Sequence, residues 1–120
     1  MKITYFVSAG TADPTRASIP LHLAANGSVE IGQETSIVLG GDAAELLLGD
    51  TAAALEGLGV PPMRELLAKL RDHEVPVFVL KGCAVARGAN DDDLEKVGGS
   101  WVAPPDVARL FGDSDRVVTF

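Results

Sequence analysis

The sequence predicts an α/β fold, a three-layer α/β/α sandwich built on an open, mostly parallel sheet of about five strands. Short apolar segments alternate along the chain with segments of helical periodicity, and several of them are continuously apolar, as in strands covered on both faces. Aromatic residues make up only 5% of the 120 residues, so the core must be mainly aliphatic. At this length we expect one domain spanning residues 1–120.

Runs rich in β-branched and aromatic residues predict the strands. They are Ile3–Val7, Thr35–Leu39, Pro76–Leu80 and Arg116–Phe120, with a weaker run at Ser100–Val102. Helical segments between successive strands predict right-handed crossovers and hence parallel neighbours. The expected core is formed by apolar positions of the strands and of the clearest helix: Val7, Ile37, Leu39, Leu66, Leu70, Val77, Val79 and Val118.

Caps and periodicity predict the helices. Asp13, as a cap, and Pro14, in the first turn, predict a helix to about Ile31, with a kink or break caused by Pro20 and Asn26–Gly27. The clearest helix is Pro62–His73, because its apolar residues recur at i, i+3, i+4 and i+7. Shorter helices are predicted at Ala43–Leu48 and from the acidic turn Asp91–Asp93 to about Val97, with one turn at Ala84–Arg87.

Charge and composition exclude several classes of function. The net charge of −7 and the absence of a basic stripe argue against a nucleic-acid partner. The first apolar run is too short to cross a membrane and is not followed by a cleavage pattern, so we expect a cytoplasmic protein. One cysteine and two histidines form neither an intramolecular disulfide nor a structural zinc site, and no cofactor-binding motif is present.

Three segments carry a family likeness. The first is the loop and helix start at Ser8–Ala17, with the pattern Asp-Pro-x-Arg-Ala; the second is Val77–Gly88, a strand followed by a loop with Cys83 and an Arg-Gly ending. The third is the closing strand Asp115–Phe120. Together with the order of the elements, these segments resemble the DsrE/DsrF-like family over nearly the whole chain.

The resemblance implies a three-layer α/β/α fold and a homo-oligomer, often built on trimers. In some members of the family a cysteine carries persulfide sulfur between donor and acceptor proteins. When the Arg-Gly ending is superposed on Arg87–Gly88, the cysteine of those members falls near Leu80 and not on Cys83. Other members have a cysteine at the position of Cys83, and many of these have no established activity.

Cys83 is the main candidate for chemistry. It follows a predicted buried strand, and the carboxyl ends of strands are where ligand sites collect in open α/β sheets. Unpaired N–H groups of the following turn, with Lys81 and Arg87, would favour the reactive thiolate. The alternative interpretation is a buried cysteine that acts as a small hydrophobe.

The turns after the first two strands are predicted to lie at the same sheet edge as Cys83. Their candidate pocket-lining residues are Ser8, Gly10, Thr11, Gly41 and Asp42. Neither turn matches a phosphate-binding loop, so turn formation and helix capping also explain these residues. Single histidines at positions 22 and 73 fit packing and helix-terminal roles, and Trp101 and Phe111 fit the core or a subunit contact.

Two functions of different classes remain open. The first is a sulfur carrier in which Cys83 accepts a sulfane sulfur from a donor protein and passes it on. A single cysteine suits this role, because a persulfide needs no resolving partner. The second is a non-catalytic oligomeric module that binds a small ligand or a partner at the same strand ends, with Cys83 as part of the wall.

Overall fold

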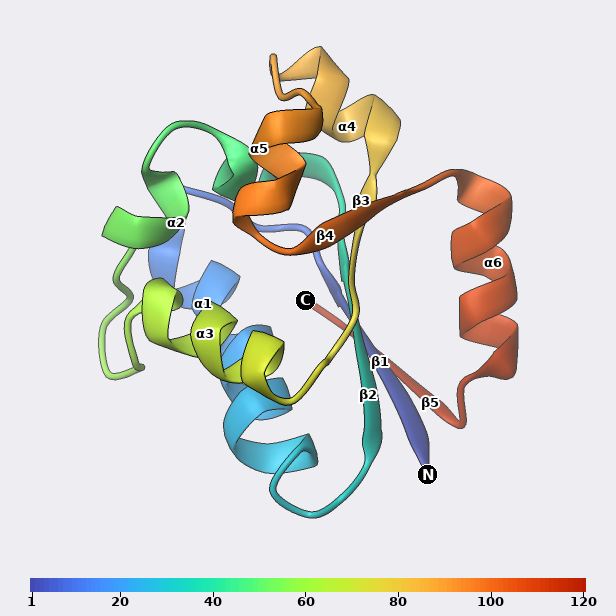
Figure 1. Cartoon of the computed structure of the whole chain (residues 1–120). Helices are drawn as coiled ribbons and strands as arrows, with labels where there is room; N and C mark the ends of the chain where they lie inside the picture. The colour runs from blue at the N-terminus through green and yellow to red at the C-terminus, as the bar shows by residue number, and fades with distance from the viewer.

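A computed structural model describes all residues, 1–120, and contains one five-stranded sheet. The strands are β1 (Lys2–Val7), β2 (Glu34–Leu39), β3 (Val77–Leu80), β4 (Gly99–Val102) and β5 (Arg116–Thr119). Their spatial order is β4-β3-β2-β1-β5, and every neighbouring pair is parallel. The predicted α/β fold is therefore confirmed, and the sheet is parallel throughout (Figure 1).

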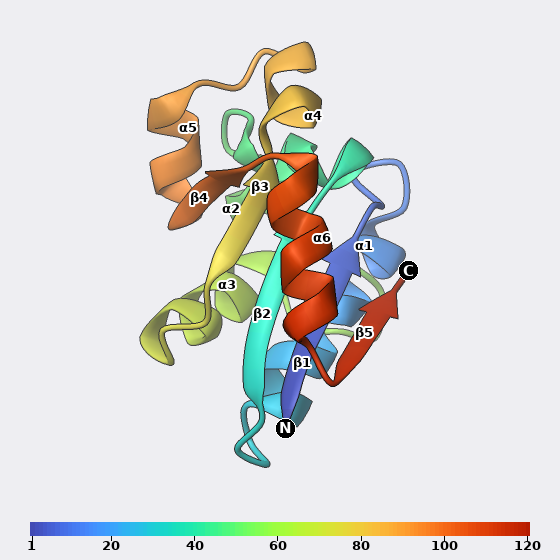
Figure 2. The same ribbon diagram turned by 90° about the vertical axis from the view of Figure 1, so that its right-hand side faces the viewer.

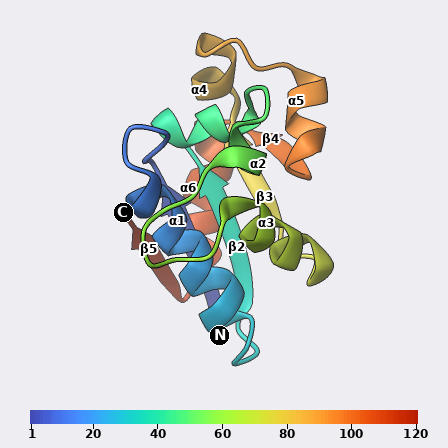
Figure 3. The same ribbon diagram turned by 90° about the vertical axis from the view of Figure 1, so that its left-hand side faces the viewer.

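Helices cover the two faces of the sheet unequally. Along the chain they are α1 (Pro14–Leu23), the π-helix η1 (Ala24–Ser28), the 3-10 helix η2 (Gly41–Leu47), α2 (Thr51–Ala54), α3 (Met63–Asp72), α4 (Lys81–Ala86), α5 (Asp91–Lys96) and α6 (Pro104–Asp113). Figure 3 shows α1 and α3 on one face, whereas Figure 2 shows α6 on the other. None of these helices is both long enough and apolar enough to cross a membrane.

The first helix begins as predicted but changes its geometry along its length. The Asp13 carboxylate accepts a hydrogen bond from the backbone N–H of Arg16 at 3.2 Å, as an N-cap should. The α-helix ends at Leu23 and continues as a π-helix through Ser28, so the helical segment ends a few residues before the predicted Ile31. Pro20 lies inside α1 and cannot donate a backbone hydrogen bond, which supports the predicted irregularity.

Helix α6 was not predicted from the sequence. Pro104 lies in its first turn, and the Asp106 carboxylate accepts a hydrogen bond from the backbone N–H of Ala103 at 2.8 Å. Phe111 packs edge-on against Phe6 of β1, with ring centroids 6.1 Å apart. This contact gives Phe111 the intramolecular packing role that was one of its two predicted roles.

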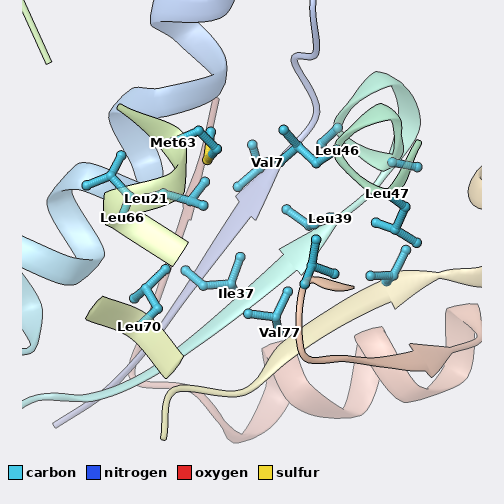
Figure 4. Packing of buried hydrophobic residues seen from close by; sticks show 14 of the residues in the cluster. Val7, Leu21, Ile37, Leu39, Leu46, Leu47, Met63, Leu66, Leu70 and Val77 are labelled. Carbon is cyan, nitrogen blue, oxygen red and sulfur yellow. The ribbon is translucent and has the colours of Figure 1, made fainter. Parts of the chain in front are cut away.

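The main core lies between the sheet and the layer that contains α1 and α3 (Figure 4). All but one of the predicted core residues are buried there, from Val7 on β1 to Leu66 and Leu70 on α3. Val118 is the exception, since it packs against this core but remains half-buried. Its strand, β5, is an edge strand with a neighbour on one side only.

Candidate functional site

Cys83 lies where a central strand passes directly into a helix. β3 ends at Leu80, and α4 begins at Lys81, so Cys83 is the third residue of a six-residue helix. The side chain is half-buried and lines an open pocket of about 580 Å³. The lining residues come from the end of β3, the start of α4, the end of β4 and the start of α6: Leu80, Lys81, Gly82, Cys83, Trp101, Val102, Ala103, Pro104 and Asp106.

Two side chains organise one wall of this pocket. The indole Nε1 of Trp101 donates a hydrogen bond to the Asp91 carboxylate at 2.7 Å, which fixes the ring at the end of β4. The Lys81 ammonium lies 5.9 Å from the centre of that ring, within the range of a cation–π interaction. Lys81 therefore shares the pocket with Cys83, as the sequence suggested, and Trp101 is a lining residue that the sequence did not suggest.

The only carboxylate of the pocket is already engaged. Asp106 accepts hydrogen bonds from the backbone N–H of Ala103 at 2.8 Å and from the guanidinium of Arg109 at 2.9 Å. The pKa of Asp106 is held below its ordinary value mainly by the hydrogen bond from the Ala103 backbone N–H, and to a smaller extent by the hydrogen bond from Arg109. Lys81, in contrast, forms neither a salt bridge nor a hydrogen bond with another side chain.

Arg87 supports the cysteine turn, the first turn of α4 that contains Cys83. Its Nη1 donates to the backbone carbonyl of Cys83 at 3.0 Å, and its Nη2 donates to the Asp42 carboxylate at 2.8 Å. The hydrogen bond with Asp42 is the main reason that the pKa of Arg87 is raised, and the negative charge of Asp42 adds to this shift. Because Asp42 shares the guanidinium charge, Arg87 serves mainly to fix the geometry of the turn.

The turns after β1 and β2 meet at the same sheet edge, but they do not line the Cys83 pocket. The Ser8 hydroxyl donates to the carbonyl of Phe120 at 2.6 Å, and the backbone N–H and hydroxyl of Thr11 donate to Glu45 at 2.9 and 3.2 Å. Gly10 is buried against the backbone of Asp42. Thr11 and Gly10 therefore join the two turns to each other, Ser8 binds the C-terminal residue, and Asp42 connects the turns to Arg87 beneath Cys83.

Gly41 and Thr11 complete the set of predicted pocket residues. Gly41 has a φ of 52°, a conformation that suits glycine at the start of η2. Thr11 lines a separate pocket near α2, with Asp50 and Glu56. Glu45, which binds Thr11, was missed by sequence reasoning, since nothing around it in the sequence distinguishes it from an ordinary helical surface residue.

The remaining polar candidates have local partners. His22 pairs with Asn26 at 3.0 Å, and His73 with the carbonyl of Lys69 at 2.9 Å. The acidic run Asp91–Asp93 forms the first turn of α5, as predicted, and Asp93 completes a capping box with Asn90. No group of three or more His, Cys, Asp or Glu side chains is placed to hold a metal ion.

Solved structures of other proteins share this fold over nearly the whole chain. The crystal structure of the ychN protein from E. coli superposes with a TM-score of 0.77 at 20% identity, covering 100% of this chain and 99% of that one. A conserved protein of unknown function, BT1422 from Bacteroides thetaiotaomicron, gives a TM-score of 0.74 at 12% identity, with coverages of 99% and 94%. At these identities the likeness shows the fold alone.

A search of curated protein sequences found no significant match. A sequence profile of the DsrE/DsrF-like family, in contrast, matches residues 1–120. The three segments from which the resemblance was inferred all lie within this match. The chain therefore belongs to the DsrE/DsrF-like family.

Proposed function

We propose that the protein carries sulfane sulfur as a persulfide on Cys83. The observation that carries the proposal is the position of this thiol: half-buried in the helical turn that follows a parallel strand, in the wall of an open pocket that Lys81 also lines. Ligand sites of open parallel sheets collect at this edge. A nearby cation favours the thiolate, which is the nucleophilic form of cysteine.

The transfer needs no net oxidation or reduction. The Cys83 thiolate attacks the outer sulfur of a donor persulfide, R–S–SH; a new S–S bond forms, the S–S bond of the donor breaks, and R–S⁻ leaves. In the second step a thiolate of an acceptor attacks the outer sulfur, and Cys83 leaves as a thiolate. A single cysteine is sufficient for both steps, and the chain has only one.

Membership of the family supports the sulfur-carrier function, although the cysteine of this chain lies at a different position from that of the relay members. Relay members have their cysteine near the position of Leu80, so Cys83 would present its sulfur from the first turn of α4 instead of from the strand end. The pocket still lies beside both positions, because Leu80 and Cys83 both line it. The rival function, a binding module in which Cys83 only forms part of the wall, is favoured by the mainly apolar lining of the same pocket.

Sulfur loading tests the carrier function directly. After incubation with glutathione persulfide, mass spectrometry of the intact protein should show the added mass of one sulfur atom, and peptide mapping should place it on Cys83. The matched control is Cys83→Ser, which should gain nothing. If neither glutathione persulfide nor inorganic polysulfide adds sulfur to the folded wild-type protein, the carrier function is excluded and the binding module remains.

The alkylation rate of Cys83 measures how its neighbours affect it. Iodoacetamide should modify the native protein, and Lys81→Ala should slow the reaction at neutral pH, because it removes an unpaired cation from the same pocket wall. Arg87→Ala should slow it less, since Asp42 already shares the charge of Arg87. A thiol that reacts only after unfolding would contradict the proposed reactivity.

Homo-oligomerisation, in trimers or multiples of three, is also part of the proposal. Its support is the membership of the DsrE/DsrF-like family, together with exposed apolar side chains at the β5 edge, Val117 and Phe120. Light scattering at micromolar concentration should give a mass above that of the 12.5 kDa chain. A single species of the monomer mass would contradict it.

A further inference from the structure

The charges around the Cys83 pocket are unbalanced. Its two ionic groups are Lys81 and Asp106, apart from the thiol itself. Asp106 uses its carboxylate for the cap of α6 and for Arg109, both through hydrogen bonds of ordinary length. Lys81 has no carboxylate partner, and its contact is with the face of Trp101. The pocket therefore offers one unpaired positive charge.

The rest of the wall is apolar and contains a fixed flat surface. Leu80, Val102, Ala103 and Pro104 contribute aliphatic groups, and Trp101 contributes an aromatic ring. The hydrogen bond between Trp101 and Asp91 holds that ring in place without a ligand. A volume of about 580 Å³ is within the usual range of small-molecule sites.

From this complementarity we propose that the pocket binds a small organic anion with a flat apolar body. The anionic end lies at Lys81, and the body stacks against Trp101 and the apolar residues at the start of α6. The ammonium of a lysine is a compact charge on a flexible side chain and does not require a planar partner. Sulfonates and carboxylates therefore belong to the same ligand class. The binding requires no sulfur on Cys83 and extends beyond the carrier function.

Trp101 makes the test direct, because it is the only tryptophan of the chain and lies in the pocket wall. The probe is benzenesulfonate, which is anionic at neutral pH and does not react with a thiol. Titration into the full-length Cys83→Ser protein, followed by tryptophan fluorescence, should give a saturable change. The neutral analogue benzenesulfonamide should bind about fivefold more weakly, the factor that about 1 kcal/mol of lost charge interaction produces.

Two lysine variants separate a specific site from general attraction to a cation. Lys81→Gln should weaken benzenesulfonate binding about fivefold and leave benzenesulfonamide binding unchanged. Lys2→Gln removes the same charge at the start of β1, at the opposite end of the sheet, and should change neither. Lys81 is exposed, so its substitution should not disturb folding.

The outcomes distinguish this inference from the carrier function. Equal affinity for benzenesulfonate of the Cys83→Ser protein with and without Lys81→Gln, equal affinity for the two probes, or the same loss on adding Lys2→Gln would overturn the anion site. A protein that binds benzenesulfonate as expected but takes no sulfur on Cys83 supports the site and excludes the carrier. A protein that loads sulfur but shows no saturable binding of benzenesulfonate keeps the carrier function and overturns the site.

Discussion

Replacement of Leu66 by alanine is expected to lower the free energy of unfolding by about 2–5 kcal/mol, the range for a fully buried leucine. Leu66 is 1% exposed and lies on α3, in the core layer that also contains Leu21 and Met63 (Figure 4). The methyl groups that the substitution removes leave a cavity that the surrounding strands cannot easily fill. Urea denaturation followed by circular dichroism measures the loss.

The matched control is the same substitution at Leu58. This leucine is 89% exposed, so Leu58→Ala should change the stability by less than about 0.5 kcal/mol. Together the two variants separate burial from the change of residue type. If Leu66→Ala behaves like Leu58→Ala, then α3 does not pack against the sheet as described.

The strands could be predicted from the sequence because they are rich in β-branched and other apolar residues, and the central strand β2 is buried on both faces over nearly its whole length. Thr35–Leu39 was predicted within one residue of the observed strand β2, which lies near the middle of the sheet. The weaker prediction at Ser100–Val102 corresponds to β4, an edge strand with no buried residue. The other edge strand, β5, also has no buried residue, yet its run was as clear as those of the inner strands, so β-branched residues mark a strand even at the edge of the sheet.

Helix α6 is the helix that was not predicted from the sequence. Its apolar face consists of Val107, Leu110 and Phe111, spaced as in an amphipathic helix, but only Val107 is buried. The helix is alone on its face of the sheet (Figure 2), and the spacing of its apolar residues at i, i+3 and i+4 was a helical signal that the sequence analysis missed. The Pro-Pro-Asp sequence at the start of α6 is also typical of a helix N-terminus and could have been used to predict this helix.

Only those contacts of the site that join residues close together in the sequence could be predicted. Lys81 and Cys83 share a pocket because they lie in the same turn after β3. Trp101 and Asp106 reach that pocket because β4 is the neighbour of β3, a pairing that the sequence does not specify. The contact between Arg87 and Asp42 likewise joins two turns that are far apart along the chain.

Replacement of Gly10 by alanine is expected to destabilise the protein by about 1–3 kcal/mol, as overpacking does. A Cβ atom at Gly10 would lie closer than 3.0 Å to the backbone carbonyl of Asp42 and to the carboxylate of Glu45. The Glu45 side chain can rotate away, but the carbonyl group belongs to the main chain. The turn after β1 and the start of η2 must therefore separate, and thermal denaturation should show a lower midpoint.

Gly82→Ala is the matched control, because a Cβ atom there has no neighbour within 4 Å. Gly82 lies beside Cys83 in α4, where alanine favours the helix, so the stability of the Gly82→Ala protein should be unchanged or slightly raised.

Gly10→Ala should also alter the cysteine turn, since a shift of Asp42 weakens its ion pair with Arg87 and thereby the support of the Cys83 carbonyl. The alkylation rate of Cys83 in Gly10→Ala, compared with wild type at a temperature where both proteins are folded, measures this coupling; Gly82→Ala serves as the control for stability only, because Gly82 lines the Cys83 pocket. A Gly10→Ala protein with wild-type stability and a wild-type alkylation rate would show that the two turns are not rigidly packed together.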